Sequence, residues 1–360
     1  MSPGISSKRY SPRILLLCRC NTAQFSNPLP YPSTIVNLKV THCEQLTRRR
    51  WLVHTASAAT VALTGSHLLP LAAKEAAEGP NLDDHPWIDA HSHVWTHDIN
   101  KYPLADGITV DDLSPIFTEK ELLATAQANG VGRVVLIHHH PFYGWDSSYL
   151  LDVAANYPKT FRVVGTVDNL TENPGKQMRT LLDQHVTGFR ITSSMHHKKW
   201  LAGGMDEMWL TAADTGQNIC CLINPEEISQ IDAMCKRFPN TPVVIDHFAR
   251  VGVDGEIRDA DVNALCGLAQ HPLTTLKVSA FYALGKKTPP YLDLAPMIRR
   301  VLDAYGPERL MWASDSPYQL SGDNTYEASI SLIRDRLDFL SNGDREWLLS
   351  KTAERVFFFV

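Results

Sequence analysis

Eight short β-rich segments alternate with helical segments along most of the chain, and this alternation limits the fold more than any other feature. The segments with strand composition are residues 87–93, 133–138, 161–167, 188–191, 219–223, 242–247, 276–279 and 310–313. Apolar residues recur with helical spacing in residues 118–129, 147–157, 174–185, 205–215, 225–238, 260–270, 291–305, 326–339 and 344–356. The strand segments show little polar alternation, which is typical of a parallel sheet covered on both faces.

This pattern predicts an α/β fold, and within that class a (β/α)8 barrel over residues 80–360. Eight strand–helix units in about 275 residues fit a barrel, whose typical length is about 250 residues. A doubly wound open sheet is the alternative. The barrel is favoured because polar residues follow the strand segments all along the chain. In a barrel the carboxyl ends of all strands meet at one mouth.

The N-terminal part has a different composition from the rest. Residues 1–79 contain nine Lys/Arg and three Asp/Glu, although the whole chain has a net charge of -5. Residues 47–53 read Thr-Arg-Arg-Arg-Trp-Leu-Val and precede an Ala/Thr-rich stretch. This indicates a twin-arginine export signal over residues 47–79 and a periplasmic location, or a cytoplasmic one if the leader does not function. Residues 1–46 are a polar, Pro/Ser-rich extension, disordered or an over-long translation start.

Composition also limits the partners. The acidic body argues against nucleic-acid binding, which needs a basic stripe. The apolar part of the leader is too interrupted to be a stable membrane span. Seven cysteines without a CxxC pair predict neither a disulfide scaffold nor a cysteine zinc site. A small molecule is therefore the expected partner, and the oligomeric state stays open.

The first strand segment carries a candidate metal motif. Asp89, His91 and His93 are spaced by two residues, so the sequence predicts that all three project from one side of the strand. Two imidazoles in this arrangement can bind a divalent metal ion, with Asp89 one layer below them as an orienting residue.

Two later strand segments end in residues with catalytic potential. His247 closes the segment 242–247, and its neighbour Asp246 is expected either to face the helices, where it would need a partner, or to lie beyond the regular strand. Asp315 follows the segment 310–313, with Ala313 below it on the same face. An aspartate at this point can bind a metal ion together with His91 and His93, or accept a proton from an attacking water.

The remaining strand ends supply candidate substrate contacts. An arginine in an apolar strand is costly to bury without a partner, so Arg190 is interpreted as a clamp for a substrate carboxylate or as half of a structural ion pair. Three consecutive histidines, residues 138–140, end the second strand segment. Strand alternation places His138 on the same face as Val134 and Leu136, so it is the candidate for the site. The other two are assigned to a loop. The candidate substrate-binding residues are Arg190, His138, Lys277, Ser279 and Tyr282.

Taken in order, these segments resemble the amidohydrolase superfamily, in its amidohydrolase-related branch of lactonase-like and 2-pyrone-4,6-dicarboxylate-hydrolase-like barrels. The resemblance covers roughly residues 87–358. It rests on the stretches that begin Ile88-Asp-Ala-His-Ser-His, Thr187-Gly-Phe-Arg, Asn224-Pro-Glu-Glu, Val244-Ile-Asp-His, Lys277-Val-Ser-Ala-Phe-Tyr, Trp312-Ala-Ser-Asp-Ser-Pro and Thr352-Ala-Glu-Arg-Val-Phe.

The resemblance implies a distorted barrel and a hydrolase that opens a lactone or a related carboxylate-bearing ring. By position it places His91, His93, His247 and Asp315 in the active site. Many metal-binding members carry a histidine after the fifth strand, where this chain has Asn224. One divalent ion, zinc as the first choice, is therefore expected, with metal-independent catalysis as the alternative.

The main hypothesis is water attack on the lactone carbonyl, with Asp315 as general base and His247 helping to polarise the carbonyl. Two other functions fit the same barrel. One is a metal-dependent decarboxylase, which needs a firm metal site, and the missing histidine after the fifth strand counts against it. The other is a non-catalytic exported binding barrel, against which the retained histidine pair and Asp315 count.

Overall fold

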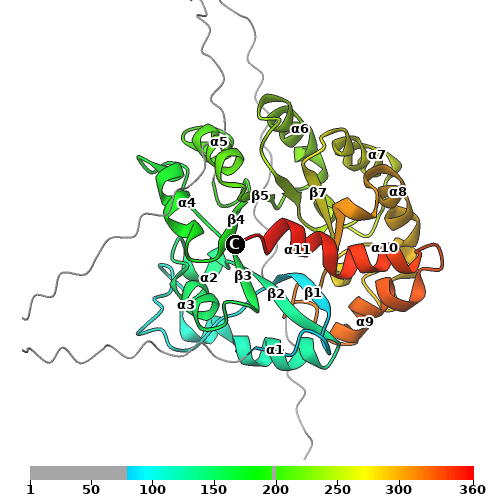
Figure 1. The fold of residues 1–360 in the computed structure, drawn as a ribbon, viewed down its shortest axis with the longest axis horizontal. Coiled ribbons are helices and arrows are strands. Elements are labelled where there is room, and N and C mark those ends of the chain that lie inside the picture. The colour runs from blue at the N-terminus through cyan, green and yellow to red at the C-terminus, as the bar shows by residue number, and fades with distance from the viewer. Residues whose placement is uncertain (1–78, 197–199) are drawn as a thin grey trace, which may run out of the picture. The chain divides into compact units, whose positions relative to one another are not determined.

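The computed structural model describes residues 79–196 and 200–360, and these form a barrel of eight parallel strands (Figure 1). The strands are hydrogen bonded in sequence order, each to the next. They are β1 (Trp87–Ser92), β2 (Val131–Ile137), β3 (Phe161–Gly165), β4 (Val186–Ile191), β5 (Asn218–Cys221), β6 (Val243–Ile245), β7 (Thr274–Ser279) and β8 (Leu310–Ala313). Each expected strand segment overlaps one of them, so the barrel prediction is confirmed.

The barrel closes between β1 and the residues that follow β8. The N–H of Asp315 donates to the carbonyl of His91 at 2.8 Å, and the N–H of His93 donates to the carbonyl of Ser316 at 2.7 Å. Both bonds hold residues of the predicted site, so the closing seam of the barrel also positions the functional side chains.

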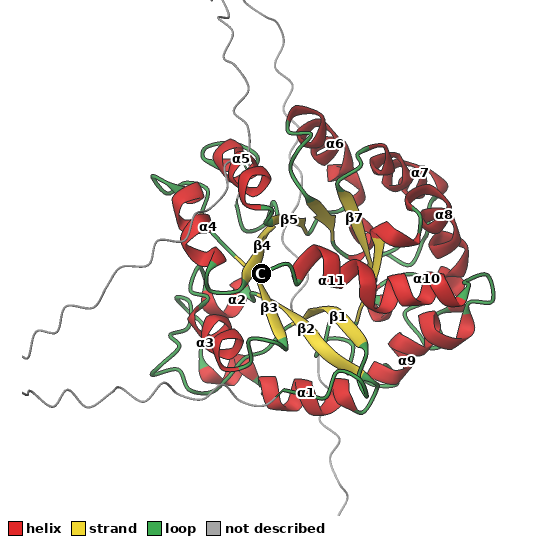
Figure 2. Cartoon of the chain, in the orientation of Figure 1, coloured by secondary structure: helices red, strands yellow, loops and turns green. Residues whose placement is uncertain are grey.

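Helices surround the strands, and every expected helical segment overlaps at least one of them (Figure 2). They are α1 (Glu119–Gln127), α2 (His140–Tyr143), α3 (Ser148–Asn156), α4 (Pro174–Leu182), α5 (Met205–Thr215), α6 (Ile228–Arg237), α7 (Asp259–Gly267), α8 (Ala295–Tyr305), α9 (Tyr326–Ser331), α10 (Asn342–Glu346) and α11 (Thr352–Phe357). The short helix α2 is additional to the sequence prediction. Within the described residues, no helix is both long and apolar enough to cross a membrane.

Local sequence explains where several helices begin and end. Thr118 and Glu121 form a capping box at the start of α1, in which the Glu121 carboxylate accepts the N–H of Thr118. Helix α5 ends at Gly216, whose φ of 76° lies in the left-handed region that favours glycine.

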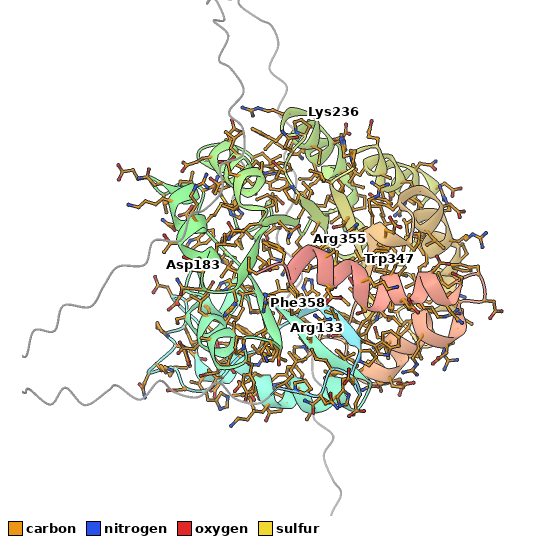
Figure 3. All side chains as sticks on the ribbon, in the orientation of Figure 1. Arg133, Asp183, Lys236, Trp347, Arg355 and Phe358 are labelled. Carbon is orange, nitrogen blue, oxygen red and sulfur yellow. The ribbon has the colours of Figure 1, made fainter. Side chains whose placement is uncertain are left out.

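Two apolar clusters form the core. The larger one lies between the strands and the surrounding helices. The smaller one contains interior barrel residues together with the last helix: Ile88, Ala90, Val135, Ile137, Val164, Cys220, Val244, Met311, Ala313, Ala353, Val356 and Phe357. Helix α11 therefore covers one end of the barrel, as Figure 1 shows, and leaves the other end for a site. At the covered end the Arg133 guanidinium lies 4.9 Å from the Phe358 ring centroid (Figure 3).

The prediction that Asp89 lies beneath His91 on one side of β1 is wrong. The pairing of β1 with β2 shifts register between Asp89 and Ser92, which breaks the two-residue alternation. The Asp89 carboxylate accepts hydrogen bonds from Tyr326 of α9 at 2.9 Å and from the Ser314 hydroxyl at 2.5 Å. Asp89 thus links β1 to the outer helix and to the end of β8.

The predicted export signal and N-terminal extension fall almost entirely on residues 1–78, which lie outside the described part of the chain.

Candidate functional site

Asp315 lies at the centre of the site, two residues beyond the end of β8. Its Oδ1 atom is 3.5 Å from Nε2 of His91 and 3.5 Å from Nε2 of His93. Its Oδ2 atom is 3.8 Å from Nε2 of His247 and accepts a hydrogen bond of 2.7 Å from the Tyr282 hydroxyl. The structure thus brings both histidines of the first strand, the β6 histidine and the β8 aspartate into one cluster.

The cluster holds a charged carboxylate next to the neutral imidazoles of His91 and His247. Burial opposes the charge of Asp315, but His247 and the two histidines of β1 outweigh it and hold the pKa of the carboxyl well below its ordinary value. Burial lowers the pKa of His247 to about 4 and lowers the pKa of His91 well below its ordinary value. Near pH 7 both rings are therefore neutral and Asp315 is ionised.

A buried ion network lies next to this cluster. The Asp246 carboxylate is 3.0 Å from Nζ of Lys277 and 3.1 Å from Nη2 of Arg190, and its side chain is fully buried. Burial raises the pKa of Asp246, but the two cations outweigh it, so the pKa lies well below its ordinary value. Of the two positions that the sequence left open for Asp246, the structure shows the one beyond the regular strand. The strand β6 ends at Ile245, so strand alternation no longer applies to Asp246.

Both ring nitrogens of His91 face cationic side chains of this network. Its Nδ1 is 3.2 Å from Nζ of Lys277, and its Nε2 is 3.0 Å from Nη2 of Arg190. These neighbours explain why charging His91 is unfavourable and fix the orientation of its ring.

A cavity of about 480 Å³ opens above Asp315, within the usual range of small-molecule sites. Five candidate residues line it together with Asp315: His93, His138, Arg190, His247 and Tyr282. Lys277 and Ser279, also predicted to bind substrate, do not line this cavity. Lys277 is fully buried against Asp246, and the Ser279 hydroxyl lies 2.8 Å from Nδ1 of His247, so both support other site residues.

Both ring nitrogens of His138 have partners within the protein. Its Nε2 is 2.7 Å from the Gly144 carbonyl oxygen, and its Nδ1 is 3.1 Å from the Ser147 hydroxyl. Its neighbours His139 and His140, assigned to a loop by sequence reasoning, also line the cavity. The helix α2 begins at His140 and turns the chain back over the barrel mouth, and nothing in the strand pattern signals it.

Sequence reasoning also missed Tyr318 and Arg250. The Tyr318 hydroxyl lies 2.5 Å from Nε2 of His139, whose ring centroid is 5.3 Å from that of His93. Residues 247–250 have φ angles of 52–58°, an unusual left-handed turn for non-glycine residues, and this turn brings Arg250 to the cavity. Tyr318 could have been identified from the sequence, because it is an aromatic residue directly after Asp315-Ser-Pro.

Three side chains of the cluster can bind a divalent metal ion. One ligand atom each of His91, His247 and Asp315 lies within 4.8 Å of the others. Neutral imidazoles and an ionised carboxylate are suitable ligands for such an ion. The sequence-predicted set had His93 in place of His247. Nη2 of Arg190 lies 3.0 Å from Nε2 of His91, so an ion bound at that nitrogen would compete with Arg190.

Comparison with known proteins identifies the chain. A family model described as amidohydrolase matches residues 88–359, most of the barrel. The chain belongs to the amidohydrolase family. It is 29% identical over 238 residues to an L-fucono-1,5-lactonase of Burkholderia ambifaria, covering 64% of this chain and 80% of the relative. It is 24% identical over 242 residues to a 4-sulfomuconolactone hydrolase of Hydrogenophaga intermedia, covering 64% and 74%.

Solved structures share the fold of this amidohydrolase. A crystal structure of an amidohydrolase from Burkholderia multivorans with bound zinc superposes with a TM-score of 0.64 at 22% identity, over 76% of this chain and 99% of the other. Together, the family match and the relatives assign the chain as a hydrolase of the lactonase-like branch, which confirms the resemblance drawn from the motifs. Both of these relatives are named as lactone hydrolases.

Proposed function

We propose that this amidohydrolase opens a carboxylate-bearing lactone ring by water attack, with Asp315 as the base. The observation that carries the proposal is the buried, ionised Asp315 carboxylate, which faces three imidazoles at the cavity. A protein that only binds a ligand would gain nothing from removing the Asp315 carboxylate from water and placing it at the cavity. The lactone-hydrolysing relatives support the same reaction.

In this proposal each step uses a group that borders the cavity. Asp315 accepts a proton from water as the water oxygen attacks the carbonyl carbon. The ring C–O bond then breaks, and the leaving oxygen takes a proton to give a hydroxy acid. A carboxylate of low pKa is a weak base, so much of the rate must come from donors that stabilise the developing oxyanion. His247 and Tyr282 are placed for that role.

Arg190 is the proposed contact for the substrate carboxylate. It lines the cavity while Asp246 holds one face of its guanidinium. Arg250 adds a second positive charge at the same cavity. These cations offset the acidic net charge of the chain for an anionic substrate.

A divalent ion would be held by His91, His247 and Asp315, and zinc is the ion we propose. Such an ion, when bound, lowers the pKa of water and polarises a carbonyl. A metal-dependent decarboxylase is less well supported, because the curated relatives are lactone hydrolases.

The test combines a substrate panel with metal analysis. The purified protein is assayed against five- and six-membered lactones with and without a carboxylate, and its metal content is measured before and after chelation. The proposal requires ring opening of at least one lactone, with preference for the carboxylated members. Absence of hydrolysis across the panel, in protein shown to be folded, contradicts it.

A further inference from the structure

One side of the cavity is apolar, and the proposed lactonase reaction does not use it. Six cavity residues form this surface, which we call the apolar wall: Met195, Leu222, Val253, Ala280, Ala283 and Leu284. They come from the segments that follow β4, β5, β6 and β7, and the segments after β6 and β7 also carry the polar cavity residues His247, Arg250 and Tyr282.

Backbone hydrogen bonds hold the segments of the wall together in pairs. The N–H of Leu222 donates to the carbonyl of Ile191 at 3.0 Å, which places it beside the turn that carries Met195. The N–H of Gly285 donates to the carbonyl of Gly252 at 2.9 Å, which places Leu284 beside Val253. The wall is therefore built from ordered neighbouring segments.

The side chains of the wall offer no hydrogen bonds. Two hydroxyl groups on the same side of the cavity, those of Thr192 and Ser194, lie 3.3 Å apart and can satisfy each other. A hydroxyl-bearing substituent buried against the wall would lose its water and gain no partner, which disfavours a polar substituent at this place. A hydrocarbon group in the same place would be stabilised by leaving water.

We propose that the substrate is a lactone carrying a hydrocarbon substituent, whose ring faces Asp315 and whose substituent packs on the apolar wall. This proposal rests on the lactonase function proposed above and names the substrate class within it. The cavity of about 480 Å³ has room beyond a single small ring, so a substituent is needed to fill it.

The first test is a series of six-membered lactones with unbranched alkyl chains of increasing length on the carbon next to the ring oxygen. We expect kcat/KM to rise about fourfold for each added methylene until the wall is covered. A polyhydroxylated six-membered lactone of equal ring size should be a poorer substrate than the longer alkyl lactones. A flat or falling series, or preference for the polyhydroxylated ring, overturns the proposal.

The two proposals can fail separately. If no lactone in either set is hydrolysed by folded protein, the proposed function fails. If the polyhydroxylated lactone is hydrolysed well and the alkyl lactones are not, the function stands and the apolar substrate class is wrong.

Two variants tie the effect to the wall. Val253→Thr adds a hydroxyl with almost no change of shape, and Met195→Gln adds a carboxamide on a side chain of similar length. Each should lower kcat/KM for the longest alkyl lactone several-fold and leave the unsubstituted ring nearly unchanged. Val110→Thr is the matched control, because Val110 is half-buried and does not line the cavity. Equal effects of Val253→Thr and Val110→Thr contradict the assignment of the wall.

Discussion

At the scale of the residue, the site depends on charges that lie far apart in sequence and meet in the barrel. Asp246 pairs with Arg190 and Lys277 in a buried network, and both cations also contact His91. Sequence reasoning found the cations because charged residues stand out in apolar strands. It left two positions open for their partner Asp246, because the sequence does not show that the strand ends at Ile245.

Removing the shared partner of this network should destabilise the fold. Asp246→Asn leaves two buried cations without their counter-charge, and breaking such a pair costs about 3–5 kcal/mol. Chemical denaturation measures the loss in the free energy of unfolding. Asp214→Asn is the control, because its pair with Arg179 is exposed and is worth about 1 kcal/mol or less. Similar losses in the two variants would show that the network does not hold the barrel together.

At the scale of the element, the closing seam of the barrel decides where the catalytic groups stand. The number and order of the strands could be predicted because each strand is a short apolar run between helical segments. The register shift in β1 could not, because no residue type in the Asp-Ala-His-Ser stretch marks it. It moves Asp89 onto Ser314 and Tyr326, so that side chains as well as backbone join β1 to β8.

The hydroxyl of Tyr326 should therefore matter for stability. Tyr326→Phe removes one hydrogen bond from the buried Asp89 carboxylate, which keeps those from Ser92 and Ser314, and losing one such bond costs about 0.5–1.5 kcal/mol. The midpoint of thermal unfolding and kcat on a lactone substrate should both fall, since Asp315 sits on the same seam. Tyr157→Phe serves as control on a half-buried tyrosine away from the seam. An unchanged midpoint in Tyr326→Phe would remove Asp89 from the account of barrel closure.

At the scale of the whole molecule, one end of the barrel is covered by α11 and the other end gathers the histidines. Burial lowers the pKa of His138 to about 4 and the pKa of His139 to about 2. The general location of this site was predictable, because barrel enzymes carry their chemistry at the carboxyl ends of the strands. The helix α2 and the left-handed turn at residues 247–250 could not be predicted, because loop conformations leave no periodic pattern of apolar residues in the sequence.

These histidines make stability depend on pH. The unfolded chain takes up protons at His138 and His139 below about pH 6.5, whereas the folded chain does not until a much lower pH. Protons therefore favour the unfolded chain, and the free energy of unfolding should fall as the pH drops from 6.5 to 4. Denaturation midpoints measured from pH 8 to pH 4 check this. Midpoints that stay constant down to pH 4 contradict it.

We also propose that the leader exports the protein through a twin-arginine route. Changing Arg48, Arg49 and Arg50 to Lys should retain the protein in the cytoplasm of a bacterial host, which fractionation and immunoblotting would detect. Changing Arg9, Arg13 and Arg19 to Lys makes the same kind of substitution outside residues 47–79 and should leave export intact. Identical distributions of the two triple variants would refute the assignment.

The most direct test of the account is the turnover number of Asp315→Asn on a lactone that the native protein hydrolyses. The change keeps the shape of the side chain and removes the carboxylate that accepts the proton. We predict that kcat falls by about 10²–10⁴, the usual contribution of a positioned base. Circular dichroism and metal content are measured on the same sample, and Asp183→Asn, an exposed position labelled in Figure 3, should keep native turnover. Near-native turnover in folded Asp315→Asn would contradict the role of Asp315 as the catalytic base.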